Sequence, residues 1–225
     1  MLKAIIFDFD GVITDSEILH YRSFNDILAP YDVKIKTEDY YRYYLGLSDK
    51  DFFETLIEKG FLKLNINAVS QLVRDKKVIY EQLAQTEGQI IEGVRPFLDY
   101  LSEHTIPMAI CSGALLPEIE LILEQATLRH HFKTIVSADQ VTKSKPDPEG
   151  FLLTLQRLND IVGPTAAEEC VVFEDSYWGL EGAKEAGMRT VAVTNSYPAE
   201  QLTMADQTVK RLDTLTLDDL HNLCS

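Results

Sequence analysis

Four short polar segments carry side chains that could do chemistry together, and each follows or adjoins a run of apolar residues. The segments are residues 8–12, 111–113, 145–148 and 174–175. The first holds Asp8 and Asp10, which share one side because residues two apart in a strand point the same way. The last adds Glu174 and Asp175. We expect these four carboxylates to converge on one site.

A cluster of carboxylates requires a cation, because one close pair repels by about 4 kcal/mol at an effective dielectric near 20. Oxygen ligands with room for water and a phosphate suit Mg²⁺ better than zinc, for which the sequence supplies no cluster of histidine and cysteine. A carboxylate held by the metal stays ionised and can attack phosphorus. A neighbouring carboxyl can protonate the leaving oxygen and then activate water. This division of labour fits Asp8 and Asp10.

The other two segments offer groups that bind phosphate. Ser112 supplies a hydroxyl, and Gly113 supplies a backbone N–H that no side chain obstructs. Lys145 stands directly before Pro146-Asp147-Pro148, where proline stiffens the start of a helix. Lys143 is an alternative cation, but only Lys145 adjoins the prolines. We therefore expect Ser112, Gly113 and Lys145 to hold a phosphoryl group.

The elements that position these segments alternate between strands and helices. Apolar runs predict buried strands at residues 4–7, 107–111, 134–136, 170–173 and 190–193. Helical patterns cover residues 94–104, 115–125, 149–158 and 179–185. This alternation predicts βαβ units and an open parallel sheet, an α/β fold whose ligands bind at the carboxyl ends of the strands.

Residues 16–87 break this rhythm and predict a helical insert. They contain amphipathic periodicity, as in Phe52, Phe53, Leu56 and Ile57, without a convincing buried strand. Residues 39–45 also carry four tyrosines interleaved with Arg42. Aromatic and basic residues together can bind nucleobases. In so acidic a chain we interpret the tyrosines as packing in the small core of the insert.

Composition and charge exclude several classes of partner. The chain has 36 acidic and 21 basic residues, a formal net charge of −15, which argues against binding to nucleic acid or an anionic membrane. No apolar run of 18 residues occurs, and the apolar stretch at residues 4–7 is too short for a signal peptide. The three cysteines lack metal-type spacing, and Cys111 and Cys170 lie in expected strands. These features predict a cytoplasmic protein, a small-molecule partner and, by default, a monomer.

The order of the four segments resembles that of the haloacid dehalogenase-like hydrolases. Asp8-Phe9-Asp10-Gly11-Val12-Ile13-Thr14-Asp15-Ser16 is similar to the first family signature, D-x-D-G-[VT]-[IL]-x-D-[ST]. Ser112 matches the second motif and Lys145 the third. Val172-Phe173-Glu174-Asp175-Ser176 with Gly179 matches the fourth. The resemblance spans almost the whole chain.

This resemblance implies a Rossmann-like, doubly wound core of residues 1–15 and 88–225, with a helical cap of residues 16–87 inserted after the first motif. It implies that Asp8 is the nucleophile and a Mg²⁺ ligand, and that Asp10 is the general acid and base with its backbone carbonyl on the metal. Ser112 and Lys145 would hold the phosphoryl group. Asp175 would ligate the metal, with Glu174 in or next to its ligand shell.

Within the family, the second aspartate and the metal cluster argue against dehalogenation. The nearest likeness is to β-phosphoglucomutase and the related sugar-phosphate phosphatases, and it includes His20. The mutase carries an arginine after the G-x-S of its cap to hold a second phosphate, whereas here Gly46-Leu47-Ser48 is followed by Asp49. Lys50, Arg42 or Lys76 could replace that arginine in another geometry. We therefore expect a phosphatase, with His20 and Lys50 as candidate cap residues for the substrate.

Two other functions stay open at this point. A mutase would depend on a bisphosphate activator and release little phosphate. A phosphate-sensing or partner-binding protein on the same scaffold would have little use for the proton-transfer group at Asp10. His20 could relay a proton near neutral pH or make an ordinary interhelical hydrogen bond. Closure of the cap would exclude water, with hinges at residues 14–15 and 88–92.

Overall fold

The chain divides into two compact units. The computed structural model describes residues 1–45, 47–87 and 90–225. The first unit, which we call the sheet unit, comprises Met1–Asp15 and Gln89–Ser225, and the second, the helical unit, is Ser16–Gly88. One expected hinge, residues 14–15, lies at the junction of the units. Residues 88 and 89 of the other hinge, and Gly46 of the G-x-S segment, lie outside the described residues.

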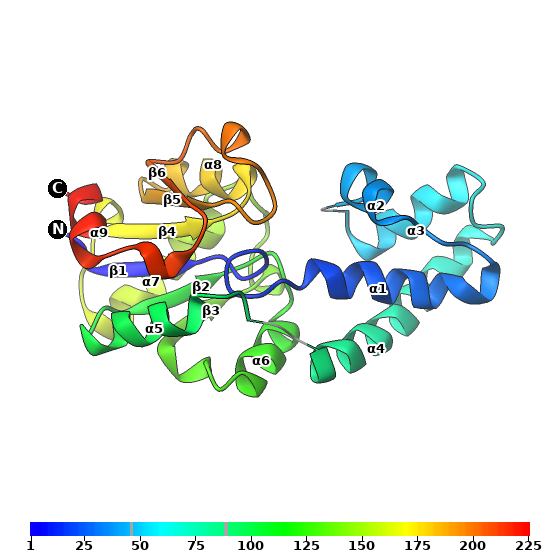
Figure 1. Ribbon diagram of the computed structural model, residues 1–225, viewed down its shortest axis with the longest axis horizontal. Helices are drawn as coiled ribbons and strands as arrows, with labels where there is room; N and C mark the ends of the chain where they lie inside the picture. Colours follow the sequence, from blue (N-terminus) through cyan, green and yellow to red (C-terminus); the bar gives the residue numbers. More distant parts are fainter. Residues whose placement is uncertain (46, 88–89) are drawn as a thin grey trace. The chain divides into compact units, whose positions relative to one another are not determined.

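The sheet unit is built on parallel strands in the order β3-β2-β1-β4-β5-β6 (Figure 1). Their bounds are β1 (Ala4–Phe7), β2 (Met108–Cys111), β3 (Phe132–Val136), β4 (Cys170–Glu174), β5 (Arg189–Val193) and β6 (Gln207–Val209). The predicted parallel sheet is therefore confirmed. The edge strand β6 was not predicted, because it spans three residues and its central residue is exposed.

Helices cover both faces of the sheet. They are α5 (Val94–Glu103), α6 (Leu116–Gln125), α7 (Glu149–Val162), α8 (Tyr177–Glu185) and α9 (Leu217–Leu223). On one face, Phe151 of α7 and Ala183 of α8 share a buried cluster with Ile6. On the other, the ring of Phe97 of α5 lies 6.4 Å from that of Phe7. Neighbouring strand residues point to opposite faces, so a sheet buried on both sides requires the continuous apolar runs seen in the sequence.

Short 3₁₀ turns complete the connections. They are η1 (Ala29–Tyr31), η2 (Ile66–Ala68), η3 (Arg129–His131), η4 (Ala138–Gln140), η5 (Ala167–Glu169), η6 (Ala199–Gln201) and η7 (Leu212–Thr214). The turn η6 belongs to the long connection between β5 and β6. That connection begins at the carboxyl end of β5, the edge of the sheet where the polar segments lie.

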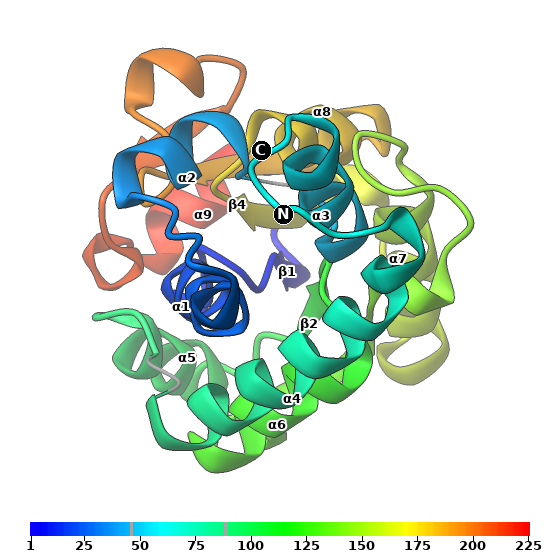
Figure 2. The same cartoon turned by 90° about the vertical axis from the view of Figure 1, so that its right-hand side faces the viewer.

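The helical unit has a core of its own. It contains α1 (Glu17–Leu28), α2 (Thr37–Tyr43), α3 (Asp49–Glu58) and α4 (Val69–Glu87), and α1 lies beside α4 (Figures 1 and 2). The rings of Phe24 and Phe52 stack 3.8 Å apart in this core. Tyr40 and Tyr44 are buried in the same cluster, which confirms the packing interpretation for them, whereas Tyr41 and Tyr43 are exposed.

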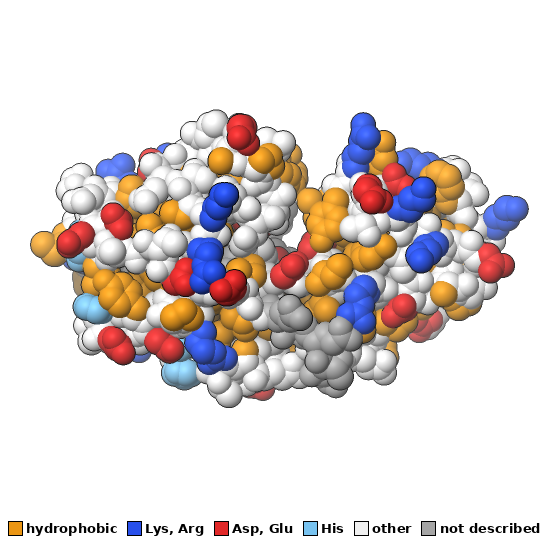
Figure 3. All heavy atoms as spheres, viewed as in Figure 1, with side chains coloured by type: hydrophobic (Ala, Val, Ile, Leu, Met, Phe, Trp, Pro, Cys, Tyr) orange, Lys and Arg blue, Asp and Glu red, His pale blue; other side chains and the backbone are white. Residues whose placement is uncertain are grey.

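The surface carries charges of both signs. Figure 3 shows acidic and basic side chains interspersed over the described residues on one face. None of the described helices combines the length and the apolar character needed to cross a membrane. Cys111, Cys170 and Cys224 are free and buried, as expected for the first two.

Candidate active site

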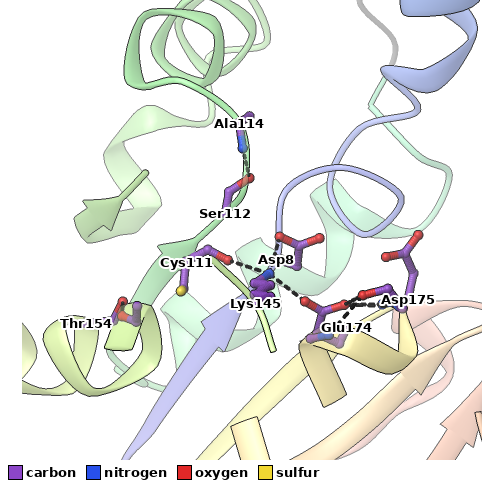
Figure 4. Close-up of polar contacts among 11 residues, drawn as sticks. Asp8, Cys111, Ser112, Ala114, Lys145, Thr154, Glu174 and Asp175 are labelled. Atoms are coloured by element: carbon purple, nitrogen blue, oxygen red, sulfur yellow. Dashed lines mark hydrogen bonds and ion pairs between the residues drawn. The ribbon is translucent and has the colours of Figure 1, made fainter. Parts of the chain in front are cut away.

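Three neighbouring strands place their polar residues at the same edge of the sheet. Asp8 follows β1, Ser112 follows β2, Glu174 ends β4 and Asp175 follows it (Figure 4). The backbone N–H of Asp8 donates to the carbonyl of Phe173 at 2.9 Å, which continues the ladder between β1 and β4. The carboxyl ends of parallel strands thus bring together residues that are more than 100 positions apart in the sequence.

Lys145, from the loop before α7, contacts residues at the ends of all three strands. Its Nζ donates to Asp8 Oδ1 at 2.8 Å, to Glu174 Oε1 at 2.5 Å and to the carbonyl of Cys111 at 3.1 Å (Figure 4). Lys143 is 70% exposed and pairs instead with Asp147, 3.1 Å away. The cation at the site is therefore Lys145, as the adjoining prolines suggested.

Glu174 is completely buried, and donors of the protein occupy both of its oxygens. While Oε1 accepts from Lys145, Oε2 accepts from the backbone N–H of Asp175 at 3.0 Å and from the N–H and hydroxyl of Ser176 at 3.0 and 2.9 Å. A Cβ at Gly179 would lie 1.7 Å from Glu174 Oε1, which explains the glycine of the fourth motif. Glu174 thus holds the turn that carries Asp175.

Asp175 is buried between two loops. The hydroxyl of Ser196 donates a hydrogen bond to its Oδ2. A Cβ at Gly11 would lie 1.8 Å from the same oxygen, and Gly11 has φ = 74°, a conformation that favours glycine. The amide Nδ2 of Asn195 donates to the carbonyl of Gly11 at 2.7 Å. Asn195 and Ser196 were not predicted from the sequence, because neither belongs to a spaced motif.

The donor set fits a divalent cation. Asp8, Glu174 and Asp175 each offer an oxygen, and these atoms lie within 4.8 Å of one another. Burial raises the pKa of Asp8 to about 7, with the charges of Glu174 and Asp10 adding to the rise and Lys145 opposing it. Burial and the neighbouring carboxylates also raise the pKa of Asp175 well above its usual value. One lysine therefore leaves this cluster short of positive charge.

Asp10 and the segment at Ser112 border this cluster. Asp10 is half-buried, and its backbone forms a bridge with Thr14. The hydroxyl of Ser112 accepts a hydrogen bond from the N–H of Ala114 at 3.0 Å. A Cβ at Gly113 would meet nothing within 4 Å, so the loop beside Ser112 is open. An anion could approach its backbone there.

The helical unit contains a second polar cluster, formed by His20, Asp49 and Lys76. Lys76 is 1% exposed, and its Nζ lies 2.6 Å from His20 Nδ1 and 2.7 Å from Asp49 Oδ1. Burial, and then the charge of Lys76, lowers the pKa of His20 well below its usual value. Lys50 does not belong to this cluster. Its side chain is 69% exposed, and its Nζ lies 3.7 Å from Glu54 Oε1. Of the two candidate cap residues, only His20 belongs to it.

Comparisons with known proteins show which family has this sequence and fold. The phosphorylated carbohydrates phosphatase of Thermotoga maritima is 32% identical over 191 residues, 84% of each chain. The β-phosphoglucomutase of Bacillus subtilis is 30% identical over 224 residues, 98% of this chain and 94% of that protein. The crystal structure of CbbY from Rhodobacter sphaeroides in complex with phosphate is similar, with a TM-score of 0.84 and 25% identity, and covers 98% of this chain and 100% of that one. The profile of the haloacid dehalogenase-like hydrolases matches residues 5–193, and the chain belongs to that family.

Proposed function

We propose that this protein is a Mg²⁺-dependent phosphatase that hydrolyses a small phosphorylated metabolite, of the sugar-phosphate type, through a phosphoryl group carried on Asp8. The observation that carries the proposal is the contact of Lys145 with Asp8 beside two further buried carboxylates. The name of the Thermotoga maritima relative, a phosphatase of phosphorylated carbohydrates, supports the substrate class.

Mg²⁺ would be held by a carboxylate oxygen of Asp8, the backbone carbonyl of Asp10 and a carboxylate oxygen of Asp175. When bound, it would neutralise the carboxylates and withdraw electron density from the phosphoryl group. We place Glu174 next to the metal, because donors of the protein already occupy both of its oxygens. Its task is to hold Lys145 and the turn at Asp175.

Asp8 and Asp10 would carry out the two steps of the reaction. Asp8 attacks phosphorus, the bond from phosphorus to the ester oxygen breaks, and Asp10 gives its proton to that leaving oxygen. Asp10 then takes a proton from water, whose oxygen attacks phosphorus and releases Asp8. Lys145 keeps Asp8 in place through its 2.8 Å contact and adds positive charge where the phosphoryl oxygens arrive.

Ser112 and Gly113 would bind the phosphoryl oxygens opposite Lys145. Support comes from the open space around Gly113 and from the position of Ser112 at the end of β2, next to Asp8 at the end of β1. The helical unit would act as a cap that excludes water while the phosphoryl group is transferred. We also propose a cytoplasmic location, which the free, buried cysteines support.

A sugar-phosphate mutase is the second candidate, because the similarity to β-phosphoglucomutase extends over 98% of this chain. A mutase must hold a second phosphate with a cation. In the helical unit, Lys76 is paired with Asp49, and Lys50 lies near Glu54. This pairing argues for simple hydrolysis.

Phosphate release from a panel of sugar phosphates and generic esters tests the proposal. We expect release that requires Mg²⁺ and disappears in Asp8→Asn, because an amide cannot form the acyl phosphate. Asp160→Asn, an exposed position on α7, should behave like the parent protein. Release by Asp8→Asn at the parental rate would refute the mechanism. Bisphosphate-dependent isomerisation of β-glucose 1-phosphate with little free phosphate would favour the mutase.

A further inference from the structure

We propose that Asn195 and Ser196, which follow β5, position the two loops that carry the metal-binding aspartates and thereby set the affinity of the site for a divalent cation. We call this pair the β5 clamp. The inference rests on the proposed Mg²⁺-dependent function. It concerns positioning residues, since neither side chain has a part in the proposed phosphoryl transfer.

Ser196 acts on the β4 loop. Its hydroxyl donates to Asp175 Oδ2, so one oxygen of this carboxylate is fixed and the other can face a cation. The oxygen that accepts this bond is also the atom that a Cβ at Gly11 would strike first. The first loop and the β5 clamp thus confine the Asp175 carboxylate from two sides.

Asn195 acts on the β1 loop. Its Nδ2 donates to the carbonyl of Gly11 at 2.7 Å, one residue after Asp10. The turn is also braced from within, because Gly11 N–H donates to the carbonyl of Thr14 at 2.8 Å. The backbone carbonyl of Asp10, a proposed metal ligand, therefore lies in a turn held from both sides. Two adjacent residues of one connection reach both acid-bearing loops.

An aromatic cluster anchors the β5 clamp. The ring of Tyr197 lies 5.7 Å from that of Tyr177 and 6.1 Å from that of Trp178, and the last two stack 3.9 Å apart. Tyr177 begins α8, two residues after Asp175. On the other side of the clamp, the N–H of Thr194 donates to the carbonyl of Val209 at 3.0 Å. The clamp is thus held at both ends and can restrain Asp175.

Residues that orient metal ligands contribute strongly to affinity, and their loss typically weakens metal binding or activity about 10–100-fold. Without the hydroxyl of Ser196, the Asp175 carboxylate can rotate. Fixing its orientation when the metal binds then costs free energy, which weakens binding. We expect about tenfold weaker binding in Ser196→Ala. Asn195→Ala should weaken binding less. Asn195 holds the turn at Gly11 through the Gly11 carbonyl, but the bond from the Gly11 N–H to the Thr14 carbonyl also holds this turn.

Metal-free protein titrated with Mn²⁺, read by electron paramagnetic resonance and competed with Mg²⁺, measures this affinity without turnover. The variants are Ser196→Ala, Asn195→Ala and Ser196→Thr, which keeps the hydroxyl. Gln201→Ala, an exposed position in the same connection, is the matched control. We expect weaker Mn²⁺ and Mg²⁺ binding in the two alanine variants at an unchanged metal-free Tm. Ser196→Thr and Gln201→Ala should bind like the parent, and saturating Mg²⁺ should restore most of the phosphate release by Ser196→Ala.

Parental affinity in Ser196→Ala would overturn the inference and leave the phosphatase intact, provided that the parent binds Mn²⁺ and releases phosphate. Weaker binding accompanied by a lower metal-free Tm, or equally weak binding by Ser196→Thr, would also overturn it, because a general loss of structure would then explain the result. A parent protein that binds no divalent cation would refute both the inference and the metal-dependent mechanism. If that protein still released phosphate without metal, only the inference and the metal dependence would fail. If it released no phosphate, the proposed phosphatase function would fail as well.

Discussion

One lysine in each unit lies in a polar cluster, and the two clusters differ in their balance of charge. Lys145 in the sheet unit contacts Asp8 and Glu174, and Asp175 lies within the same group of carboxylates. Lys76 in the helical unit contacts Asp49 and the neutral ring of His20. The cluster around Lys76 balances one positive charge with one negative charge. The cluster around Lys145 has three carboxylates for one lysine, and we expect it to take up a further cation.

This difference predicts a reactive site in the sheet unit and a structural ion pair in the helical unit. Buried charges are tolerated when they are paired, as at Lys76. Burial, together with the neighbouring carboxylates, raises the pKa of Asp8 and of Asp175, so the sheet unit holds buried acids whose charged forms are disfavoured. Strained or unbalanced groups of this kind occur preferentially at functional sites. Changes in the two clusters should therefore affect different properties of the protein.

The largest effect is expected from Lys145→Met. Removing a charged donor aimed at the reacting group typically costs about 10²–10³-fold in rate. We expect a loss of this size in kcat/KM for the best phosphate ester of the panel. Lys143→Met is the control, because Lys143 is exposed and pairs with Asp147. Equal losses in both variants would remove the distinction between the two lysines.

Lys76→Met should act mainly on stability. It leaves Asp49 without its partner beside an apolar core, where breaking a buried pair costs about 3–5 kcal/mol. Because Asp49 is partly exposed, we expect a smaller loss, about 1–3 kcal/mol in the free energy of unfolding measured with urea. Lys77→Met on the same helix should cost less than about 0.5 kcal/mol, since Lys77 is exposed. A parental unfolding midpoint in Lys76→Met would show that the pair contributes no stability.

Much of the sheet unit and its cluster could be predicted from the sequence. Asp8, Glu174 and Asp175 stand where apolar runs end, and this position alone places them at one edge of a parallel sheet. The presence of Lys145 beside them could be inferred from the prolines that follow it. These residues combine a local pattern with a topological rule, so their proximity does not depend on the details of side-chain packing.

The parts that were missed depend on tertiary contacts. Ser196 lies in a polar connection without periodicity, and its bond to Asp175 joins residues 21 positions apart. The pair of Asp49 and Lys76 joins two helices across 27 positions, and no sequence pattern specified that these charges would meet. By residue type Lys50 was as good a candidate for a cap cation as Lys76, but its side chain is exposed and lies near Glu54. Pairing between distant elements has to be seen in the structure.

Asp175→Asn tests the charge excess of the sheet unit directly. Without metal, the substitution removes one buried carboxylate whose pKa is raised by burial and by its neighbours. We expect the metal-free protein to become more stable near neutral pH, on the order of 1 kcal/mol as is typical of single substitutions, while the rise in Tm on adding Mg²⁺ disappears. Thermal unfolding with and without Mg²⁺ measures both effects. Asp160→Asn should change neither, and a metal-free Asp175→Asn protein less stable than the parent would contradict the expected repulsion.

The smallest effect concerns the pH dependence of the balanced cluster. Burial and Lys76 lower the pKa of His20 in the folded state, Asp49 pairs with Lys76, and the ring of Tyr80 stacks on that of His20. As the pH falls, His20 therefore takes up a proton at a higher pH in the unfolded chain than in the folded one. This difference lowers the free energy of unfolding by about 0.7 kcal/mol between pH 7 and pH 6. His20→Gln keeps an acceptor for Lys76 without titrating, so the difference in stability between this variant and the parent should change by that amount. A constant difference for His20→Gln would mean that His20 titrates alike in the folded and unfolded states, and the cluster would then not be held as one lysine, one carboxylate and a neutral ring.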